Sequence, residues 1–408
     1  KLHALLTRHE RIVIDTETER VKEIGAGRLQ LIGISVGRDH GESWYPTEVV
    51  KTYLSYWLAQ PHHTLVGHNL QFDVKVLERW IGGGVKAKLW DTMHATHFER
   101  PDLPEILKPK ALDTMMSRIP YVRYSNWKER FRSEEDMNGV RYNQLDCANT
   151  WMGMEDKIRT LGGTGRLRFF EGTMMPCLRV LIDMERRGVK IDTGRLMEMK
   201  RVQQELVDEL NKMWDEEAPG VNYDSTGKTG DLQKFVYGKL GLEVQKKRGM
   251  GGAVTLDKDA LEHLVKMYPE CKAIKILAGL RHAQGILVKY LDLELDERGY
   301  LHPQYNLSGT TTSRLSSGGE EGFNFQNIPR PGEGCKAKMT RCQCQFLREL
   351  FISEHGVAVG DWSQIEYRIT ALLAREEWLL EAYKAPRFDI HQDAASKLGV
   401  TRSVAKNI

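Results

Sequence analysis

Two segments in the second half of the chain constrain its fold more than any other part of the sequence. They are SGTTTSRLSSGGEEGFNFQNIPR, from Ser308 to Arg330, and VAVGDWSQIEYRITALLA, from Val357 to Ala374. In the second segment the apolar run Val357–Val359 predicts a short buried strand, and a helix is expected to begin at Ser363 or Gln364. Asp361 would then follow the strand, where many folds hold a metal ion or a phosphate. Taken alone, it would more often be a helix cap.

Together, the two segments resemble two signatures of the family A, polymerase I-like, DNA polymerases. The first resembles the T-G-R-L…Q-N-I-P-R segment of the family, and the second resembles its palm motif A, D-Y-S-Q-I-E-L-R. The matching residues are Thr312, Arg314, Leu315, Gln326, Asn327, Ile328, Pro329 and Arg330, then Asp361, Ser363, Gln364, Ile365, Glu366 and Arg368. Ser313, Trp362 and Tyr367 depart from the family pattern, and none of these departures removes a charge that the chemistry needs.

Acidic residues also follow a predicted strand near the start of the chain. The apolar run Ile12–Ile14 predicts that strand, and Leu29–Val36 predicts a second one. Asp15 and Glu17 are two residues apart, so on an extended chain they project from the same face. Without further context, such alternation is usually a solvated strand edge.

Two more acidic positions follow along the chain. A short strand is expected to end near Gly67, Asn69 is placed to cap the next helix, and Asp73 lies in the first turn of that helix. Tyr142 and Asp146 are spaced i, i+4, so on a helix they share one face. Each feature alone is compatible with an ordinary helix surface.

The order and spacing of these pieces resemble the three motifs of the DEDDy proofreading exonucleases. The residues that this resemblance assigns to two Mg²⁺ or Mn²⁺ ions are Asp15, Glu17, Asp73 and Asp146. Tyr142 would orient the attacking water, whereas Asp91 and Asp113 are expected to be structural. The set is physically consistent, because clustered carboxylates repel one another unless cations lie between them. Two ions ~3.5–4 Å apart would activate a water and stabilise the leaving 3′ oxygen.

The middle of the chain predicts a helical thumb. Apolar residues recur at helical spacing over residues 171–184, and Gly188 is expected to end this helix. The predicted helix resembles the first palm helix of the family. Leu196–Trp214 predicts a long amphipathic helix. Further on, three adjacent cations lie among glycines: Lys246, Lys247 and Arg248. Such a cluster is usually a solvated loop, but at a thumb tip we expect contacts to the phosphate backbone.

The resemblance also implies contacts to DNA and nucleotide. The residues expected in the primer–template minor groove, where polar side chains reach acceptors shared by all base pairs, are Arg314, Gln326 and Asn327. Glu366 matches the residue that crowds the sugar 2′ position and excludes ribonucleotides. His391 belongs to a D-I-H segment near the incoming nucleotide. Arg402 and Lys406, spaced i, i+4, match the start of the fingers helix that binds the triphosphate.

The six cysteines are sparse, which favours a reducing compartment over a disulfide scaffold. Cys335, Cys342 and Cys344 cluster in a polar, basic insert between Pro331 and Gln345. Three thiols could contribute to a zinc site, but the sequence shows no C-x-x-C pair and no obvious fourth ligand. We therefore predict a flexible surface insert with free thiols.

Length and charge limit the class of protein. A chain of 408 residues is too long for one core. The net charge of +3 neither demands nor excludes nucleic acid, since basic grooves and acidic metal sites cancel in a total. No apolar run approaches the ~20 residues of a membrane span and no signal peptide is present, so we expect a cytoplasmic protein of a bacterial cell or a phage-infected host, with no membrane partner.

These observations predict an α/β protein made of several parts. They are a ribonuclease H-like exonuclease domain with a mixed sheet (1–155), the start of a palm (156–200), a mainly helical thumb (201–290), an α+β palm with motif A (291–375) and the start of the fingers (376–408). The chain starts at Lys1 rather than Met and stops at Ile408 within a predicted helix. We therefore expect the second palm carboxylate to lie beyond residue 408, and this chain to be competent as an exonuclease only.

The predicted function is that of a DNA-directed DNA polymerase with a 3′–5′ proofreading exonuclease. It would act on primer–template DNA, single-stranded 3′ ends and dNTPs, with two Mg²⁺ or Mn²⁺ ions per active site. No processivity partner can be named from the sequence. Two alternatives stay open: a stand-alone DEDDy exonuclease, against which the palm signatures argue, and a non-catalytic DNA clamp.

Overall fold

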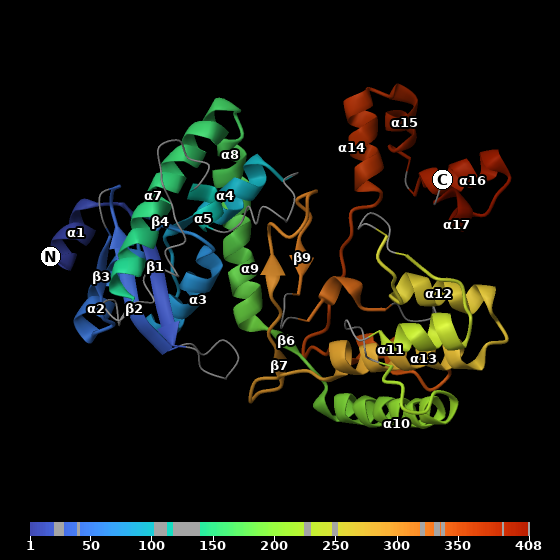
Figure 1. The fold of residues 1–408 in the computed structure, drawn as a ribbon. Helices are drawn as coiled ribbons and strands as arrows, with labels where there is room; N and C mark the ends of the chain where they lie inside the picture. The colour runs from blue at the N-terminus through green and yellow to red at the C-terminus, as the bar shows by residue number, and fades with distance from the viewer. Residues whose placement is uncertain are drawn as a thin grey trace. The chain divides into compact units, whose positions relative to one another are not determined.

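The structure is a computed structural model that divides into two compact units, Lys1–Ile352 and Ser353–Ile408. The residues that it describes are 1–19, 28–38, 41–101, 112–116 (of 113 and 114 only the backbone), 139–223, 230–246, 252–318, 323–329, 335, 339–385 and 387–406. The first unit contains two hydrophobic cores, one N-terminal and one C-terminal within it. Figure 1 shows the elements that surround each core.

The N-terminal core is built on a mixed five-stranded sheet with the order β3-β2-β1-β4-β5. Its strands are β1 (Arg11–Glu19), β2 (Arg28–Ser35), β3 (Glu42–Trp44), β4 (Thr64–Gly67) and β5 (Lys88–Asp91). β1 pairs antiparallel with β2 and parallel with β4. Ile12–Ile14 of β1 is at most 1% exposed, as expected for a central strand that is covered on both faces.

Helices complete this domain and confirm its predicted α/β fold. They are α1 (Leu2–Arg8), α2 (Glu48–Leu58), α3 (Leu70–Ile81), α4 (Thr92–Glu99), α5 (Leu112–Met116) and α7 (Val140–Gly163). The long helix α7 packs across β1 and β2, and α3 contacts β1, β4 and β5 (Figure 1). The sheet is therefore bracketed by the two helices that carry the predicted acidic residues.

A buried carboxylate ties this domain to the elements that follow. These are α8 (Leu167–Phe169), the π-helical turn η3 (Phe170–Met174) and α9 (Met175–Arg187). Gly188 ends α9 with a φ of 70°, as the sequence predicts. On α9, Glu185 is 3% exposed and accepts hydrogen bonds from Gln71 and Lys75 of α3, at 2.6 and 2.8 Å. The backbone N–H of Tyr305 donates to the same carboxylate, at 2.5 Å.

The second core is mainly helical. Its helices are α10 (Thr193–Glu217), α11 (Asp231–Gln233), η4 (Lys234–Lys239), α12 (Lys258–Met267), α13 (Lys272–Ile286) and η5 (Leu287–Leu291). Shorter elements are β6 (Val189–Lys190) with β7 (Tyr300–Leu301), β8 (Tyr305–Asn306) with β9 (Ser316–Ser317), η6 (Phe325–Asn327), η7 (Gln343–Gln345) and η8 (Leu347–Leu350). α10 contains the predicted amphipathic helix Leu196–Trp214 and packs on α13.

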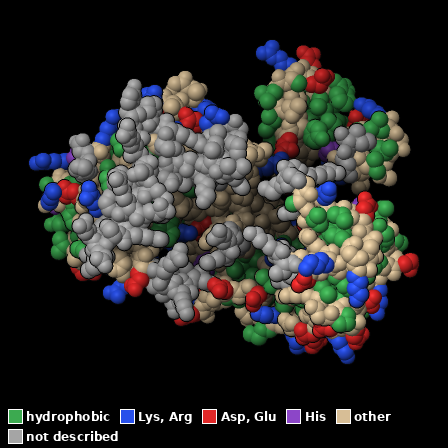
Figure 2. Space-filling model, viewed as in Figure 1, with side chains coloured by type: hydrophobic (Ala, Val, Ile, Leu, Met, Phe, Trp, Pro, Cys, Tyr) green, Lys and Arg blue, Asp and Glu red, His purple; other side chains and the backbone are tan. Residues whose placement is uncertain are grey.

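The second unit consists of short helices with little buried surface. They are α14 (Ile365–Ala374), α15 (Glu377–Ala382), α16 (Ile390–Leu398) and α17 (Arg402–Ala405). Apolar side chains such as Leu372 and Leu373 are 63% and 78% exposed, and Figure 2 shows hydrophobic side chains at the surface of α14 and α15. Among the residues described in this unit, the buried ones are Ala371, Tyr383, Ala395 and Ala405.

The predicted strand Val357–Val359 is wrong. These residues have no regular secondary structure, and Val357 and Val359 are 74% and 92% exposed. A strand requires a neighbour for its backbone hydrogen bonds, and within the described ranges no strand or isolated bridge pairs with this segment. The following helix begins at Ile365, after Gln364 with a φ of 53°.

No helix within the described ranges is both long enough and apolar enough to cross a membrane.

Candidate active site

Strand β1 presents the first two predicted ligands at the centre of the sheet. The buried run Ile12–Ile14 leads directly into Asp15, and Glu17 follows on the same strand face. Both carboxylate side chains are partly buried. The register between β1 and β2 shifts between Glu17 and Thr18. Such irregularities often lie beside active sites, because they re-aim a neighbouring side chain.

Asp73, in the first turn of α3, contacts this strand. Its Oδ1 accepts hydrogen bonds from the backbone N–H of Thr16 (2.9 Å) and from the Thr16 hydroxyl (2.7 Å). Asn69 is the N-cap residue, with a φ of 64°, but its side chain makes no capping hydrogen bond. Instead the buried Asp91 accepts from the backbone N–H of Leu70, at 2.6 Å. Asp91 therefore fixes the start of α3, which agrees with its predicted structural role.

Helix α7, which packs against β1 and β2, carries the remaining predicted residues. Asp146 is 8% exposed and lies one turn after Tyr142. Between them, the fully buried Asn143 donates from Nδ2 to Asp15 Oδ2 (2.8 Å) and to the Asp15 carbonyl oxygen (3.2 Å). The Ser43 hydroxyl donates to Asn143 Oδ1 at 2.7 Å, so the orientation of this amide is fixed.

A glycine on β2 allows α7 to approach the sheet this closely. Gly33 lies opposite Asp15 in the β1–β2 register. A Cβ atom on Gly33 would lie 2.6 Å from Cys147 Sγ and would clash with the Asn143 amide. Any larger residue would push α7 away from β1. The hydrogen bond between Asn143 and Asp15 would then be lost.

The carboxylates influence one another strongly. Burial raises the pKa of Asp15 well above its usual value, and a hydrogen bond from Asn143 opposes this effect. The neighbouring charges that raise the same pKa further are those of Asp73, Asp146 and Glu17. The pKa of Asp73 is raised to about 7, primarily by burial, although the two hydrogen bonds from Thr16 lower it. The four carboxylates thus share one poorly solvated region.

This set of donors fits hard divalent cations. Carboxylate oxygens are the ligands that Mg²⁺ and Mn²⁺ prefer. A cation between them would replace mutual repulsion by attraction. The adjacent thiol does not compete for such a cation, because burial raises the pKa of Cys147 well above its usual value, and the charges of Asp15 and Asp146 raise it further. The predicted ligands Asp15, Glu17, Asp73 and Asp146 supply oxygens of this kind, and their role as metal ligands stays a prediction.

The residues predicted to contact the minor groove also lie in the first unit, but far from these carboxylates along the sequence. Exposed to solvent are the side chains of Arg314, Gln326 and Asn327. Gln326 joins two parts of the segment Ser308–Arg330, because its Nε2 donates to the Leu315 carbonyl (2.5 Å) and its Oε1 accepts from the Ser317 N–H (3.0 Å). Ser313, where the resembled pattern has glycine, has a φ of 56°, in the region that favours glycine.

The residues predicted to serve polymerisation lie in the second unit. Asp361 is exposed and precedes α14, whose first turn carries Glu366. The ring of His391 packs edge-on against that of Tyr367, with centroids 5.2 Å apart. Arg402 donates to Asp389 Oδ2, at 2.9 Å from Nε and 2.7 Å from Nη2. Lys406 directly follows α17. In this unit the structure thus links α14 to α16 and α16 to α17.

Several predicted positions fall outside the part of the chain that the structure describes. In the basic cluster that is predicted to form a thumb tip, Lys246 is exposed and forms an isolated bridge with Val254. Lys247 and Arg248 lie outside the described residues. The side chain of Asp113 also lies outside them. The predicted role of the basic cluster stays a prediction.

Sequence reasoning missed three residues that position the carboxylates: Thr16, Gly33 and Asn143. A lone glycine within an apolar strand often marks a close approach of another backbone or element, so Gly33 carried a usable signal. Thr16 and Asn143 carried none, because their partners Asp73 and Asp15 come from other elements of the fold.

Two family models match separate parts of the chain. A family model described as 3′–5′ exonuclease matches residues 1–146, and a family model described as DNA polymerase family A matches residues 194–407. The exonuclease match includes the carboxylates Asp15 to Asp146. The polymerase match includes the motif A segment.

Bacterial DNA polymerases I are among the similar curated proteins. The chain is 26% identical to that of Chloroflexus aurantiacus, over 94% of this chain and 41% of the relative. It is 26% identical to that of Bacillus subtilis, over 94% and 43%. The thermostable enzyme of Thermus aquaticus is 29% identical over 62% of this chain and 29% of the relative. The chain thus spans about two fifths of the length of the first two relatives.

A solved structure shares the fold. It is the POL domain of Pol1 from M. smegmatis, in complex with DNA primer-template and dNTP. The TM-score is 0.72 at 22% sequence identity, and the match covers 98% of this chain and 66% of that one. At this identity the likeness is one of fold.

Proposed function

Because the chain belongs to DNA polymerase family A, we propose that it forms part of a DNA-directed DNA polymerase with a 3′–5′ proofreading exonuclease. It would act in DNA replication or repair in the cytoplasm of a bacterial cell or a phage-infected host. Family membership argues against the stand-alone exonuclease, and the clustered carboxylates argue against a clamp without catalysis.

One observation carries the exonuclease part of this proposal. Carboxylates from β1, α3 and α7 meet in a poorly solvated region, where burial and then the neighbouring charges raise the pKa of Asp15. Like charges that lie close together destabilise the folded chain unless something offsets their repulsion. Their convergence therefore favours a site that binds cations. The exonuclease family match covers the same residues.

Divalent metal ions generally serve both domains of this family. The residues that would hold two Mg²⁺ or Mn²⁺ ions here are Asp15, Glu17, Asp73 and Asp146. When bound, such ions supply an activated water and stabilise the leaving 3′ oxygen of the DNA strand. Tyr142, one helical turn from Asp146 on α7, is the residue that would orient the water.

The remaining residues of this region hold the ligands in place. Asn143 keeps one oxygen of Asp15 directed by a 2.8 Å hydrogen bond, and Thr16 does the same for Asp73. Fixed partners behind metal ligands set ligand orientation, and their loss typically weakens metal binding or activity about 10–100-fold. Asn143 and Thr16 are therefore positioning residues in this proposal.

The polymerase part of the proposal rests on residues in both units. The residues that would contact primer–template DNA are Arg314, Gln326, Asn327 and, at the thumb tip, Lys246, Lys247 and Arg248. Asp361 would hold a metal ion beside the incoming dNTP. Contacts to that nucleotide would come from Glu366, His391, Arg402 and Lys406. The polar side chains that are exposed at Arg314, Gln326 and Asn327 support this part, because minor-groove contacts require accessible donors.

The test of the exonuclease is degradation of a 5′-labelled single-stranded DNA by the purified chain. With Mg²⁺ or Mn²⁺ we expect stepwise shortening from the 3′ end, and we expect EDTA to abolish it. The double variant Asp15→Asn with Glu17→Gln should lose more than about 100-fold in rate, since even residues behind metal ligands cost about 10–100-fold.

The matched control is Asp215→Asn with Glu216→Gln, which removes the same two charges from exposed positions on α10. This control should digest DNA at the rate of the unmodified chain. Equal rates in the Asp15/Glu17 variant and in the control would refute the assignment of the site.

A further inference from the structure

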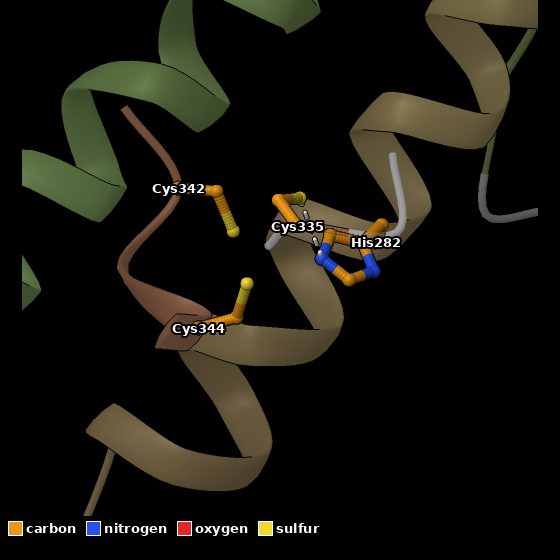
Figure 3. A group of neighbouring side chains, drawn as sticks. All are labelled: His282, Cys335, Cys342 and Cys344. Atoms are coloured by element: carbon orange, nitrogen blue, oxygen red, sulfur yellow. Dashed lines mark hydrogen bonds between the residues drawn. The ribbon is translucent and has the colours of Figure 1, made fainter. Parts of the chain in front are cut away.

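Four side chains that coordinate soft metals converge in the second core of the first unit. His282 lies on α13, Cys335 and Cys342 precede η7, and Cys344 lies within it. The potential ligand atoms all lie within 4.8 Å of one another, and His282 Nε2 is 3.3 Å from Cys335 Sγ. Figure 3 shows the three sulfur atoms and the imidazole ring directed toward one another.

This geometry corrects the predicted flexible surface insert. Cys342 is fully buried and Cys344 is 3% exposed, and both belong to the second hydrophobic core. The fourth group that the sequence did not reveal is His282, which comes from a helix well upstream. Sequence spacing could not show it, because helix α13 and the cysteine segment meet only in the folded chain.

We propose that His282, Cys335, Cys342 and Cys344 form a structural zinc site. Three thiolates and one imidazole are a ligand set of structural zinc, and four protein ligands leave no open position for substrate. In a tetrahedral site with Zn–S of about 2.3 Å and Zn–N of about 2.0–2.1 Å, the ligand atoms lie ~3.5–3.8 Å apart. The present separations, all within 4.8 Å, need only small side-chain movements to reach that geometry. Hard ions such as Mg²⁺ prefer oxygen ligands and do not suit the site.

Buried cysteines are often only small apolar core residues. Here, however, a polar imidazole is directed at the thiols. Such a contact would not stabilise a core that is only apolar. A disulfide would use two of the three thiols and leave the third and the histidine unexplained. Zinc uses all four groups, and its binding releases the protons of the three thiols to solvent while the histidine binds in its neutral form.

Independent contacts hold the two halves of the site together. The fully buried Gln203 of α10 donates to the carbonyl of Ala283, the residue after His282, at 2.8 Å. Its Oε1 accepts from the backbone N–H of Gln343, which lies between Cys342 and Cys344, at 2.9 Å. One glutamine therefore joins the helix that carries the histidine to the segment that carries two cysteines.

A second set of contacts anchors the same segment to α10. Arg341 donates to Glu209 at 2.7 Å and pairs with Glu205 at 3.5 Å. The N–H of Cys342 donates to the Met339 carbonyl at 3.3 Å. The cysteine positions are thus fixed by the fold around them, as structural metal sites require.

The site lies close in the chain to the predicted DNA-binding segment. α13 continues into η5, where the Tyr290 hydroxyl donates to the Asn327 carbonyl at 3.0 Å. Zinc would join the same helix to residues 335–344, just after that segment. The metal would therefore restrain two segments: the helix that contacts Asn327, and the residues that follow the segment expected in the minor groove.

The first test measures metal in the purified, untagged chain. Inductively coupled plasma mass spectrometry should find about one zinc per chain, and a mercurial reagent that blocks thiols should release it. Cobalt loading of the metal-stripped chain should give the strong visible bands of tetrahedral Co²⁺ with thiolate charge transfer. Less than about 0.1 zinc per chain together with no such cobalt spectrum would overturn the proposal.

Paired variants locate the site. Cys342→Ser and His282→Gln should each lose most of the zinc and alter or abolish the cobalt spectrum. The matched controls are Cys271→Ser, a partly buried cysteine adjoining α13, and His263→Gln, an exposed histidine on α12. Both controls should keep the full zinc content. Retention of zinc by Cys342→Ser and His282→Gln would overturn the proposal, whereas a loss confined to these two would support it.

Discussion

The carboxylates of the first domain and the motif A carboxylate of the second unit are held in contrasting ways. Asp15, Asp73 and Asp146 come from three elements that pack around one hydrophobic core, and fixed side chains bond to Asp15 and Asp73. Asp361 lies in an exposed segment without helix or strand. The comparison shows where the fold itself imposes a geometry on its acidic groups.

A packed core can hold like charges close together. Burial and neighbouring carboxylates raise the pKa of Asp15, so ionising it in the folded chain is unfavourable. The packing of β1, α3 and α7 offsets this repulsion, and hydrogen bonds from Asn143 and Thr16 direct the oxygens. We infer that these carboxylates are arranged before any cation binds.

The largest effect should come from closing the space between α7 and the sheet. In Gly33→Ala the new Cβ would meet Cys147 Sγ and the Asn143 amide. We expect exonuclease activity to fall at least about 10–100-fold, as for lost support of metal ligands, and unfolding free energy to fall by about 1–3 kcal/mol, as for overpacking. Rate assays and chemical denaturation measure the two effects.

The control for this change is Gly37→Ala, because a Cβ on Gly37 has no atom within 4 Å. It should leave both rate and stability close to those of the unmodified chain. If Gly33→Ala behaves like Gly37→Ala, the close approach of α7 does not determine the site.

A smaller and more local change removes the donor of the hydrogen bond to Asp15. Asn143→Asp keeps the shape of the side chain but places an acceptor where a donor directed Asp15 Oδ2. We expect about a 10–100-fold loss of exonuclease rate with the fold retained. Gln144→Glu, the neighbouring amide-to-acid change on α7, should have little effect. Equal rates for the two variants would show that Asn143 does not position Asp15.

The smallest effect concerns the two apolar runs that precede the acidic residues. Val13→Thr buries a hydroxyl within β1 and should lower the unfolding free energy by about 1–3 kcal/mol. Val359→Thr, at a position that is 92% exposed, should change it by less than about 0.5 kcal/mol. Denaturant unfolding measures both. A comparable loss in Val359→Thr would mean that residues 357–359 are buried in solution.

Sequence reasoning succeeded where local pattern decides structure. Apolar runs and turn residues predicted β1, β4 and the end of α9 at Gly188, because these depend on neighbours in the chain. The shared faces of Asp15 with Glu17 and of Tyr142 with Asp146 followed from strand and helix periodicity.

It failed where distant parts of the chain decide. The apolar run Val357–Val359 has strand composition, but composition provides no pairing partner. The histidine beside Cys335 comes from α13, and the amide beside Asp15 comes from α7, so neither could be read from spacing. The roles of the site residues and the limits of the domains stay predictions.

Binding of Mn²⁺ tests most directly the claim that the carboxylates of the first domain form a preorganised cation site. Electron paramagnetic resonance of free Mn²⁺ during titration should show about two ions bound per chain without DNA. Asp15→Asn with Glu17→Gln should abolish this binding, and Asp361→Asn should leave it unchanged. Undiminished Mn²⁺ binding in the double variant, or its loss in Asp361→Asn, would contradict the account.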